Sequence, residues 1–324
     1  MTIGEHLQEF HGLPVFEFWN AYGRSAKAAG AVPPEPGSVA WRIAVDPYES
    51  DESWEDAFAR FLDAVDTSGV RALIVGAWSD AYDSGPEAVI GALVAARDRL
   101  PALRAVFLGD MMMEECEISW INQGDVTPLL AAFPLLEELG VRGGTGLEFP
   151  AVRHERLRKL VVQTGGMPAA AVRGVAASDL PALVHLDLWL GTSDYGGDAE
   201  AGGLEPFFAG DRLPALKYLA LRNSEIQDEV CARLASAPVV ARLEVLDVSM
   251  GVLTDDGATA LLTGQPLTHL KKLDLHHNYL SAALRTRLRE TLEPAGVEVD
   301  LDPDDADSDE EEDGTVWRFV AVGE

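Results

Sequence analysis

The sequence has few cysteines, no long apolar run and no basic segment at its start. Its two cysteines, Cys116 and Cys231, lie far apart, which excludes a disulfide framework and favours reduced thiols in a cytoplasm. The longest apolar run, residues 88–96, is too short for a membrane span and is expected to lie in a helix. Glu5 stands where a secretory signal would carry basic residues. The sequence therefore predicts a cytoplasmic protein without a membrane anchor.

Basic residues are also scarce. The chain has 25 lysine and arginine residues against 54 aspartate and glutamate residues, and its formal net charge is −29. A surface of this sign repels nucleic-acid phosphates and anionic lipid headgroups, so neither nucleic acid nor membrane is expected as a partner. Two interpretations of the acidity stay open: it favours a neutral or basic protein or peptide as partner, or it serves solubility alone.

A leucine pattern organises the second half of the chain. The stretch LTHLKKLDLHHNYLS, residues 267–281, has the spacing L-x-x-L-x-L-x-x-N-x-L, and its first leucine recurs at a period of 27 residues, from Leu216 to Leu243 to Leu270. Strand-like runs followed by helix-like segments extend the pattern towards residue 40. The sequence predicts an α/β solenoid of about nine strand units, with one parallel sheet on the concave side and helices or loops on the convex side.

The string LTDDGATALL followed by LTHLKKLDLHHNYLS resembles the ribonuclease-inhibitor-like subtype of leucine-rich-repeat proteins. The resemblance is most regular over residues 213–292 and extends back to about residue 40. It implies that each unit is a concave strand and a convex helix. The whole chain, including EISWINQGDV and the ending WRFVAVGE, also resembles a bacterial leucine-rich-repeat family without an assigned activity. That resemblance implies no functional residues.

The predicted organisation is one continuous domain in three parts. Residues 1–38 form an N-terminal cap, 39–292 the repeat array, and 293–324 a C-terminal cap with an acidic loop. Residues 302–313 are rich in acids without a single base and are expected to be poorly ordered. Residues 316–322 are expected to return as a strand that buries Trp317, Phe319 and Val322 against the last repeat.

Side chains between the inward leucines should point away from the helices, onto the concave face. Neighbouring strands then place Asp247 beside Asp274, and Trp189 beside Arg222. Tryptophan, tyrosine and arginine dominate interface energetics, so we expect this face to bind a partner. The predicted contact residues are Arg142, Gln163, Asp187, Trp189, Tyr218, Arg222, Asp247, Asp274 and His276.

Two neighbouring carboxylates can also act as an acid/base pair, so an enzyme or small-molecule binder that uses Asp247 and Asp274 stays an alternative. Aspartates in such strands are expected to be open to solvent, which favours the non-catalytic interpretation. The histidines lack metal-ligand spacing. The acidic run lacks the glycine and the final glutamate of a calcium loop, which leaves only weak cation binding there. The sequence therefore predicts a protein-interaction module or scaffold with no catalytic residues, no metal site and no cofactor.

Overall fold

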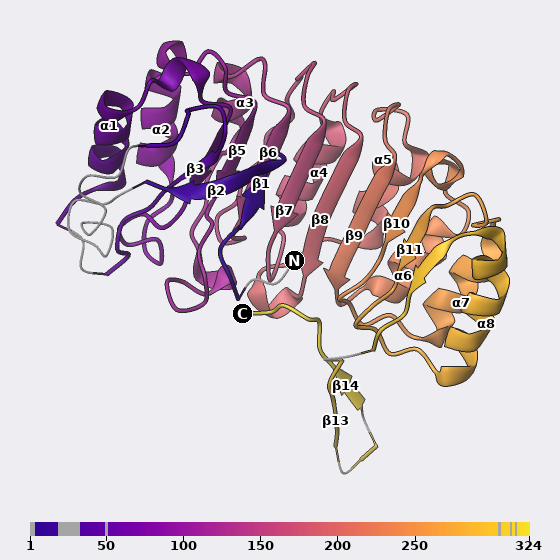
Figure 1. Cartoon of the computed structure of the whole chain (residues 1–324). Coiled ribbons are helices and arrows are strands. Elements are labelled where there is room, and N and C mark those ends of the chain that lie inside the picture. Colours follow the sequence, from indigo (N-terminus) through magenta and orange to yellow (C-terminus); the bar gives the residue numbers. More distant parts are fainter. Residues whose placement is uncertain (1–3, 19–32, 49–50, 304–305, 312, 315) are drawn as a thin grey trace.

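The computed structural model describes residues 4–18, 33–48, 51–303, 306–311, 313–314 and 316–324. Twelve strands, β1 to β12, form one sheet in the order of the chain, and Figure 1 shows them side by side from the indigo to the yellow end. Within this sheet β1 and β2 pair antiparallel, and from β2 to β12 each strand pairs parallel with the next. The strands are Glu9–Phe10 (β1), Leu13–Glu17 (β2), Ala40–Ile43 (β3), Ala72–Val75 (β4), Ala105–Leu108 (β5), Glu138–Arg142 (β6), Lys159–Gln163 (β7), His185–Gly191 (β8), Tyr218–Ser224 (β9), Val245–Asp247 (β10), Lys272–Asp274 (β11) and Glu298–Asp300 (β12).

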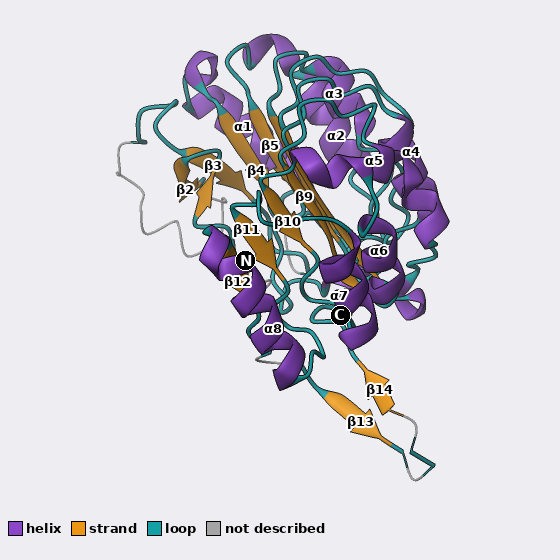
Figure 2. Cartoon of the chain, turned by 90° about the vertical axis from the view of Figure 1, so that its right-hand side faces the viewer, coloured by secondary structure: helices purple, strands orange, loops and turns teal. Residues whose placement is uncertain are grey.

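Helices connect the strands and lie along one side of the sheet (Figure 2). The opposite side, called the concave face below, carries the predicted contact residues. The fold class is therefore α/β with a long, mostly parallel sheet, as the sequence predicts. The helices are Trp54–Ala64 (α1), Glu87–Ala95 (α2), Thr127–Ala132 (α3), Ala169–Ala177 (α4), Glu205–Ala209 (α5), Gln227–Leu234 (α6), Asp255–Gly264 (α7) and Ala282–Leu292 (α8).

The core lies between the sheet and the helices. Leu186, Leu219, Leu246 and Leu273 occupy the same register position on successive strands, and all are fully buried. Because side chains alternate along a strand, this leucine stack fixes which residues face the opposite side. Among the described residues, no helix combines the length and the apolar composition needed to cross a bilayer.

Several helices begin at a polar side chain that caps their first turn. Ser53 caps α1, Thr254 caps α7 and Ser281 caps α8, each by accepting a hydrogen bond from a first-turn backbone N–H. The period also predicts Gln227 as a cap, which is wrong. Its Nε2 instead donates to the Leu221 carbonyl inside the core, and α6 begins without a side-chain cap.

The sheet has more than the nine or so predicted repeat strands, because β1 and β2 of the N-terminal segment and β12 after the last matched repeat join it. β2 pairs with β3, and β1 folds back beside β2. Leu7 and Phe10 pack on Ile74 and Phe107, which point away from the main core, so this hairpin covers the first part of the concave face. Residues 1–3 and 19–32 of the predicted cap lie outside the described residues, and the three-part division stays a prediction.

The expected C-terminal capping strand is wrong. Ser308–Glu310 (β13) and Val316–Arg318 (β14) pair as an antiparallel hairpin that projects from the body (Figures 1 and 2). Trp317 is 55% exposed and Phe319 is 48% exposed, because buried Leu292 and Val297 already close the last repeat. Part of the acidic segment thus forms a strand, while residues 304, 305 and 312 lie outside the described residues.

This difference in burial gives a matched test with two tryptophans. Trp41 is fully buried against Phe61, so Trp41→Ala should lower the free energy of unfolding by about 3–5 kcal/mol. Trp317→Ala should change it by no more than about 0.5 kcal/mol, because the side chain is already in solvent. Urea denaturation of both variants measures the difference. A large loss with Trp317→Ala would restore the capping-strand interpretation.

Candidate interaction surface

On the concave face, residues at the same register position form columns that run from strand to strand. The register confirms both predicted neighbours, since Asp247 lies opposite Asp274 and Trp189 lies opposite Arg222. The column that contains Asp247 and Asp274 continues to Asp300 on β12, so three aspartates lie on successive strands. Like charges this close repel, and the column is stable only if cations lie among them.

Arg222 supplies the first of these cations. Its Nε and Nη2 donate to the two Asp187 carboxylate oxygens at 3.0 and 2.7 Å, and its Nη1 lies 3.3 Å from Asp247 Oδ2. The guanidinium also lies over the Trp189 ring, 5.2 Å from its centre. Arg222 is only 8% exposed, and Asp247 only 2%. The expectation that these aspartates are open to solvent is therefore wrong.

Asp247 has further partners. The Tyr218 hydroxyl donates to Oδ2 at 3.0 Å, and the Ser249 hydroxyl and backbone N–H donate to Oδ1 at 2.6 and 3.0 Å. Burial and the Asp247 charge raise the pKa of Tyr218. His185 stacks on the Tyr218 ring at 3.8 Å and 7°. Burial lowers the pKa of His185 from 6.5 to about 3, and Lys159 adds to the effect, so the imidazole is neutral at pH 7.

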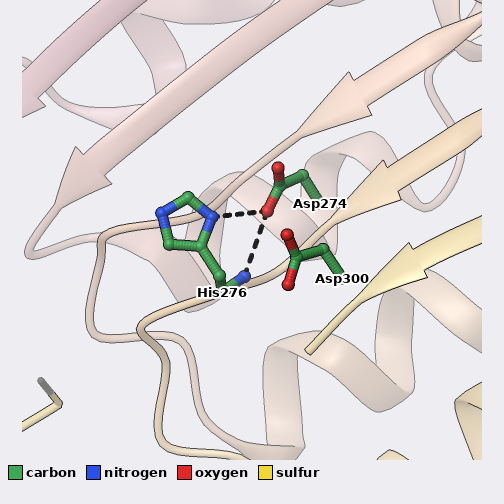
Figure 3. Close-up of side chains that lie close together, drawn as sticks. All are labelled: Asp274, His276 and Asp300. Carbon is green, nitrogen blue, oxygen red and sulfur yellow. Dashed lines mark hydrogen bonds and ion pairs between the residues drawn. The ribbon is translucent and has the colours of Figure 1, made fainter. Parts of the chain in front are cut away.

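Asp274, His276 and Asp300 form a second polar cluster, shown in Figure 3. His276 Nδ1 lies 2.6 Å from Asp274 Oδ1, and the Lys272 ammonium lies 3.0 Å from Asp274 Oδ2 and 3.8 Å from Asp300 Oδ2. Burial acts to raise the pKa of Asp274, but hydrogen bonds from His276 and Lys272 lower it to about 2. The hydrogen bond with Asp274 raises the pKa of His276.

This cluster could also hold a divalent cation. Asp274, His276 and Asp300 offer ligand atoms within 4.8 Å of one another, and carboxylate with imidazole is an acceptable ligand set. Lys272 already places a positive charge between the two carboxylates, so the pair needs no ion. This cluster was not predicted from the sequence, because Asp300 lies beyond the last matched repeat.

The paired carboxylates are poorly suited to acid/base catalysis. A general base needs a pKa near the working pH and access to a substrate proton. The pKa of Asp274 lies far below that range, and the oxygens of Asp247 are occupied by Arg222, Tyr218 and Ser249. Burial raises the pKa of Asp187, but the two hydrogen bonds from Arg222 oppose this change.

Arg142 and Gln163 lie in a different part of the concave face. Arg142 Nε donates to Gln163 Oε1 at 3.0 Å, and Nη1 donates to the Met111 carbonyl at 2.7 Å. Arg142 also lies 3.8 Å from Asp110, which Arg42 Nε binds at 2.8 Å. These residues form a buried ion cluster beneath the N-terminal segment, since the Leu7 N–H donates to Asp110 as well.

Most of the predicted contact residues are therefore buried, which corrects their expected exposure. Only Tyr218 and His276 are partly exposed. The buried ones are Arg142, Gln163, Asp187, Trp189, Arg222, Asp247 and Asp274.

Sequence analysis missed most of a neighbouring column, which we call the outer column. It consists of the residue that directly precedes the inward-facing leucine or valine of each strand from β6 to β12. Of these residues, only Tyr218 was predicted as a contact residue. Lys159 and Lys272 in this column carry ion pairs with Glu138 and Glu298 at 2.8 and 3.5 Å. The L-x-x-L spacing could have identified most of the column, because every member except Glu298, which precedes Val299, directly precedes a buried leucine. Its members in register order are Glu138, Lys159, His185, Tyr218, Val245, Lys272 and Glu298.

The similarity of this chain to known proteins lies among solved structures. No protein-family model and no curated protein matches the chain. Among solved structures, the chain is similar to a protein of Bacteroides fragilis whose crystal structure was determined by a structural genomics consortium. The two are 31% identical with a TM-score of 0.72, and the match covers 78% of this chain and 70% of that chain.

Removal of the Arg222 charge tests the buried ion cluster. Arg222→Met should lower the free energy of unfolding by about 3–5 kcal/mol, because Asp187 and Asp247 would stay buried without their cation. Lys272→Met is the matched control; since Lys272 is half-buried, we expect a cost of at most about 1 kcal/mol. Chemical denaturation measures both, and equal costs would contradict the proposed importance of Arg222.

The half-buried imidazole of His185 predicts a pH dependence of stability. Its pKa is lower in the folded state than in the unfolded chain, so the unfolded state alone binds a proton as the pH falls from about 6.5 to about 3. Stability due to this group is complete above pH 6.5 and falls by up to about 1.4 kcal/mol per pH unit below it. His185→Phe keeps a ring on Tyr218 but does not titrate, so its melting temperature should fall less steeply between pH 6.5 and 4. If the melting temperatures of the variant and the wild type fall equally steeply over this pH range, the assignment to His185 is wrong.

Proposed function

The chain belongs to the same family as the Bacteroides fragilis protein, and we propose that it is a leucine-rich-repeat interaction module, of the ribonuclease-inhibitor-like subtype, that binds a protein or peptide partner on its concave face. The sheet with connecting helices on one side supports the horseshoe architecture of that subtype. The leucine period and Asn278 support the subtype. Asn278 Oδ1 accepts from the Leu253 N–H, and its Nδ2 donates to the Val248 carbonyl.

The observation that carries this proposal is the outer column. It presents one side chain per strand at a spacing of about 4.8 Å, and an extended or helical partner could contact several of them at once. Tyr218 is held by stacking on His185 and by its hydrogen bond to Asp247. Lys272 is held by Asp274. Side chains fixed before binding lose little conformational entropy on association, which favours affinity.

The buried concave-face residues support this surface from below. Asp187, Arg222 and Asp247 form one connected ion cluster beneath Tyr218. Such a cluster restricts the side chains above it and keeps their spacing constant. In this proposal the buried residues position the contact residues, and His276 and the outer column make the contacts.

Charge indicates the partner's chemistry. The formal net charge of −29 favours a neutral or basic protein or peptide and disfavours nucleic acid and anionic membranes. Cys116 and Cys231 are buried free thiols, which supports the proposed cytoplasmic location. The alternative, an enzyme or small-molecule binder that uses Asp247 and Asp274, has the weaker support because both carboxylates are already paired.

The proposal predicts where substitutions weaken partner capture. The immobilised full chain should retain a specific protein from a lysate of its native host, and Tyr218→Ala combined with Lys272→Glu should weaken binding at least thirtyfold, since central interface residues contribute about 2 kcal/mol or more. The matched control is Arg233→Glu on the exposed surface of α6, which should leave binding unchanged. If the Tyr218→Ala, Lys272→Glu double variant captures the partner as well as the Arg233→Glu control does, the concave-face proposal is wrong.

A further inference from the structure

The last four residues of the sequence lie in a groove at the edge of the sheet. The groove, called the tail groove below, is formed by Ile118, Ser119, Gly165, Trp189, Tyr195, Asn223 and Met250, from loops and strand ends that are far apart in sequence. Residues 321–324, called the tail, approach it after β14, and Figure 1 shows the yellow chain running beneath β8 and β9 to its end.

Hydrogen bonds hold the tail along its main chain. Asn223 Nδ2 donates to the Val322 carbonyl at 2.7 Å, and Asn223 Oδ1 accepts from the Val322 N–H at 2.9 Å. The Ala321 N–H donates to the Met250 carbonyl at 2.9 Å, and the Ser119 hydroxyl donates to the Gly323 carbonyl. Main-chain recognition of this kind depends little on the bound sequence.

Asn223 is suited to this role by its backbone. Its φ is +51°, a left-handed conformation that asparagine tolerates better than most residues. Met250 and His277 have φ of +65° and +47° at equivalent positions of the next two repeats. The turn is therefore common to the regular repeats. At the position equivalent to Asn223, His277 Nε2 lies 3.4 Å from the Phe319 carbonyl oxygen, so a second turn also contacts the chain that leads to the tail.

The groove also selects side-chain size. Val322 is 7% exposed and packs on Ile118, Trp189 and Met250, in a small cluster separate from the main core. At the next position there is little room for a side chain, because a Cβ on Gly323 would lie 3.0 Å from Cε2 of Tyr195. The groove thus fits an apolar residue of the size of valine followed by glycine.

Two features indicate that the tail is not the best possible occupant. The indole N–H of Trp189 is buried beside Val322 without an acceptor among the described residues, and a buried donor of this kind usually has a partner. Glu324 brings a further carboxylate to a cavity of about 650 Å³ that Asp194, Glu225 and Asp228 already line. Its hydrogen bond from the Tyr195 hydroxyl, at 2.6 Å, does not cancel that charge.

The surroundings of the cavity favour a cation. Besides these carboxylates, its lining includes the aromatic rings of Trp317 and Phe319 and the guanidinium of Arg318, so acidic side chains outnumber basic ones among the described lining residues. Carboxylates together with aromatic rings suit an ammonium or guanidinium group. A lysine or arginine in place of Glu324 would remove the repulsion and gain these contacts.

We propose that the tail groove binds an extended segment of a partner protein with the pattern apolar residue, glycine, basic residue, and that the chain's own tail is a tethered competitor for this site. The proposal rests on the proposed function as a partner-binding module and adds the chemistry of the partner segment. The tail is joined to the body by the projecting β13–β14 hairpin, so it can leave the groove while the sheet stays folded. A second copy of the chain is a poor source of the segment, because its tail carries the same glutamate.

The test uses the full chain and three labelled peptides, FVAVGK, FVAVGE and FVADGK. Val322→Asp places a charge in the apolar cluster and should release the tail. Fluorescence polarisation should then detect FVAVGK binding to this variant at least tenfold more tightly than to the wild type, where the tail competes. FVAVGE should bind more weakly than FVAVGK, and FVADGK should not bind. Adding Asn223→Ala to the Val322→Asp variant should abolish binding.

A second measurement needs no substitution. An excess of FVAVGK should accelerate amide hydrogen exchange of the wild-type tail, whereas FVADGK should not. If FVAVGK neither binds a folded Val322→Asp variant nor accelerates this exchange, the proposal is overturned. A captured partner that is lost with the Tyr218 and Lys272 substitutions but binds Asn223→Ala as well as wild type would also overturn it, and would leave the concave-face function intact.

Discussion

The constraint on which the structure depends is the common register of the parallel strands. The inward leucines stack on successive strands, and the alternation of side chains then places every residue of the opposite face directly beside its equivalents. A repeat that places aspartate at one outward position therefore builds a column of aspartates, here Asp247, Asp274 and Asp300. Their repulsion has to be compensated by cations from the neighbouring columns, and Arg222 and Lys272 lie where that compensation requires them.

The chain itself covers two parts of the concave face. The N-terminal hairpin packs Leu7 and Phe10 on the first strands, and the tail packs Val322 against Trp189. Both segments bury polar groups that a bare sheet would expose, with Asp110 beneath the hairpin as the clearest case. Burial strengthens the electrostatic interactions of these groups and makes their partners obligatory. Between the two covers lies the outer column around Tyr218, which is therefore the part of this face with a rigid foundation and access to solvent.

How far the sequence predicted this structure depends on whether a feature repeats. The sheet, its parallel pairing and the neighbours of Asp247 and Trp189 follow from the leucine period, because one register determines them all. The N-terminal hairpin, the β13–β14 hairpin and the tail occur once, and their contacts join residues far apart in sequence. The stretch VWRFV illustrates the difficulty, since its alternation fits a buried capping strand as well as an exposed hairpin. The burial of Asp187 was missed because Arg222, its partner, comes from another strand.

Charge acts differently at the two candidate surfaces. On the concave face, carboxylates and cations alternate at short range, so the proposed recognition would depend on the positions of Tyr218, Lys272 and His276 more than on net charge. Around the tail groove, Asp194, Glu225 and Asp228 gather at one cavity, and Arg318 is the one cation among the described residues that line it. A cavity with an excess of acidic side chains attracts a basic segment from a distance, whereas a balanced surface selects by fit after contact. A partner that contacts both surfaces would first be attracted to the tail groove by charge and then be held on the concave face by fit. The two surfaces would then act in successive steps of one binding event.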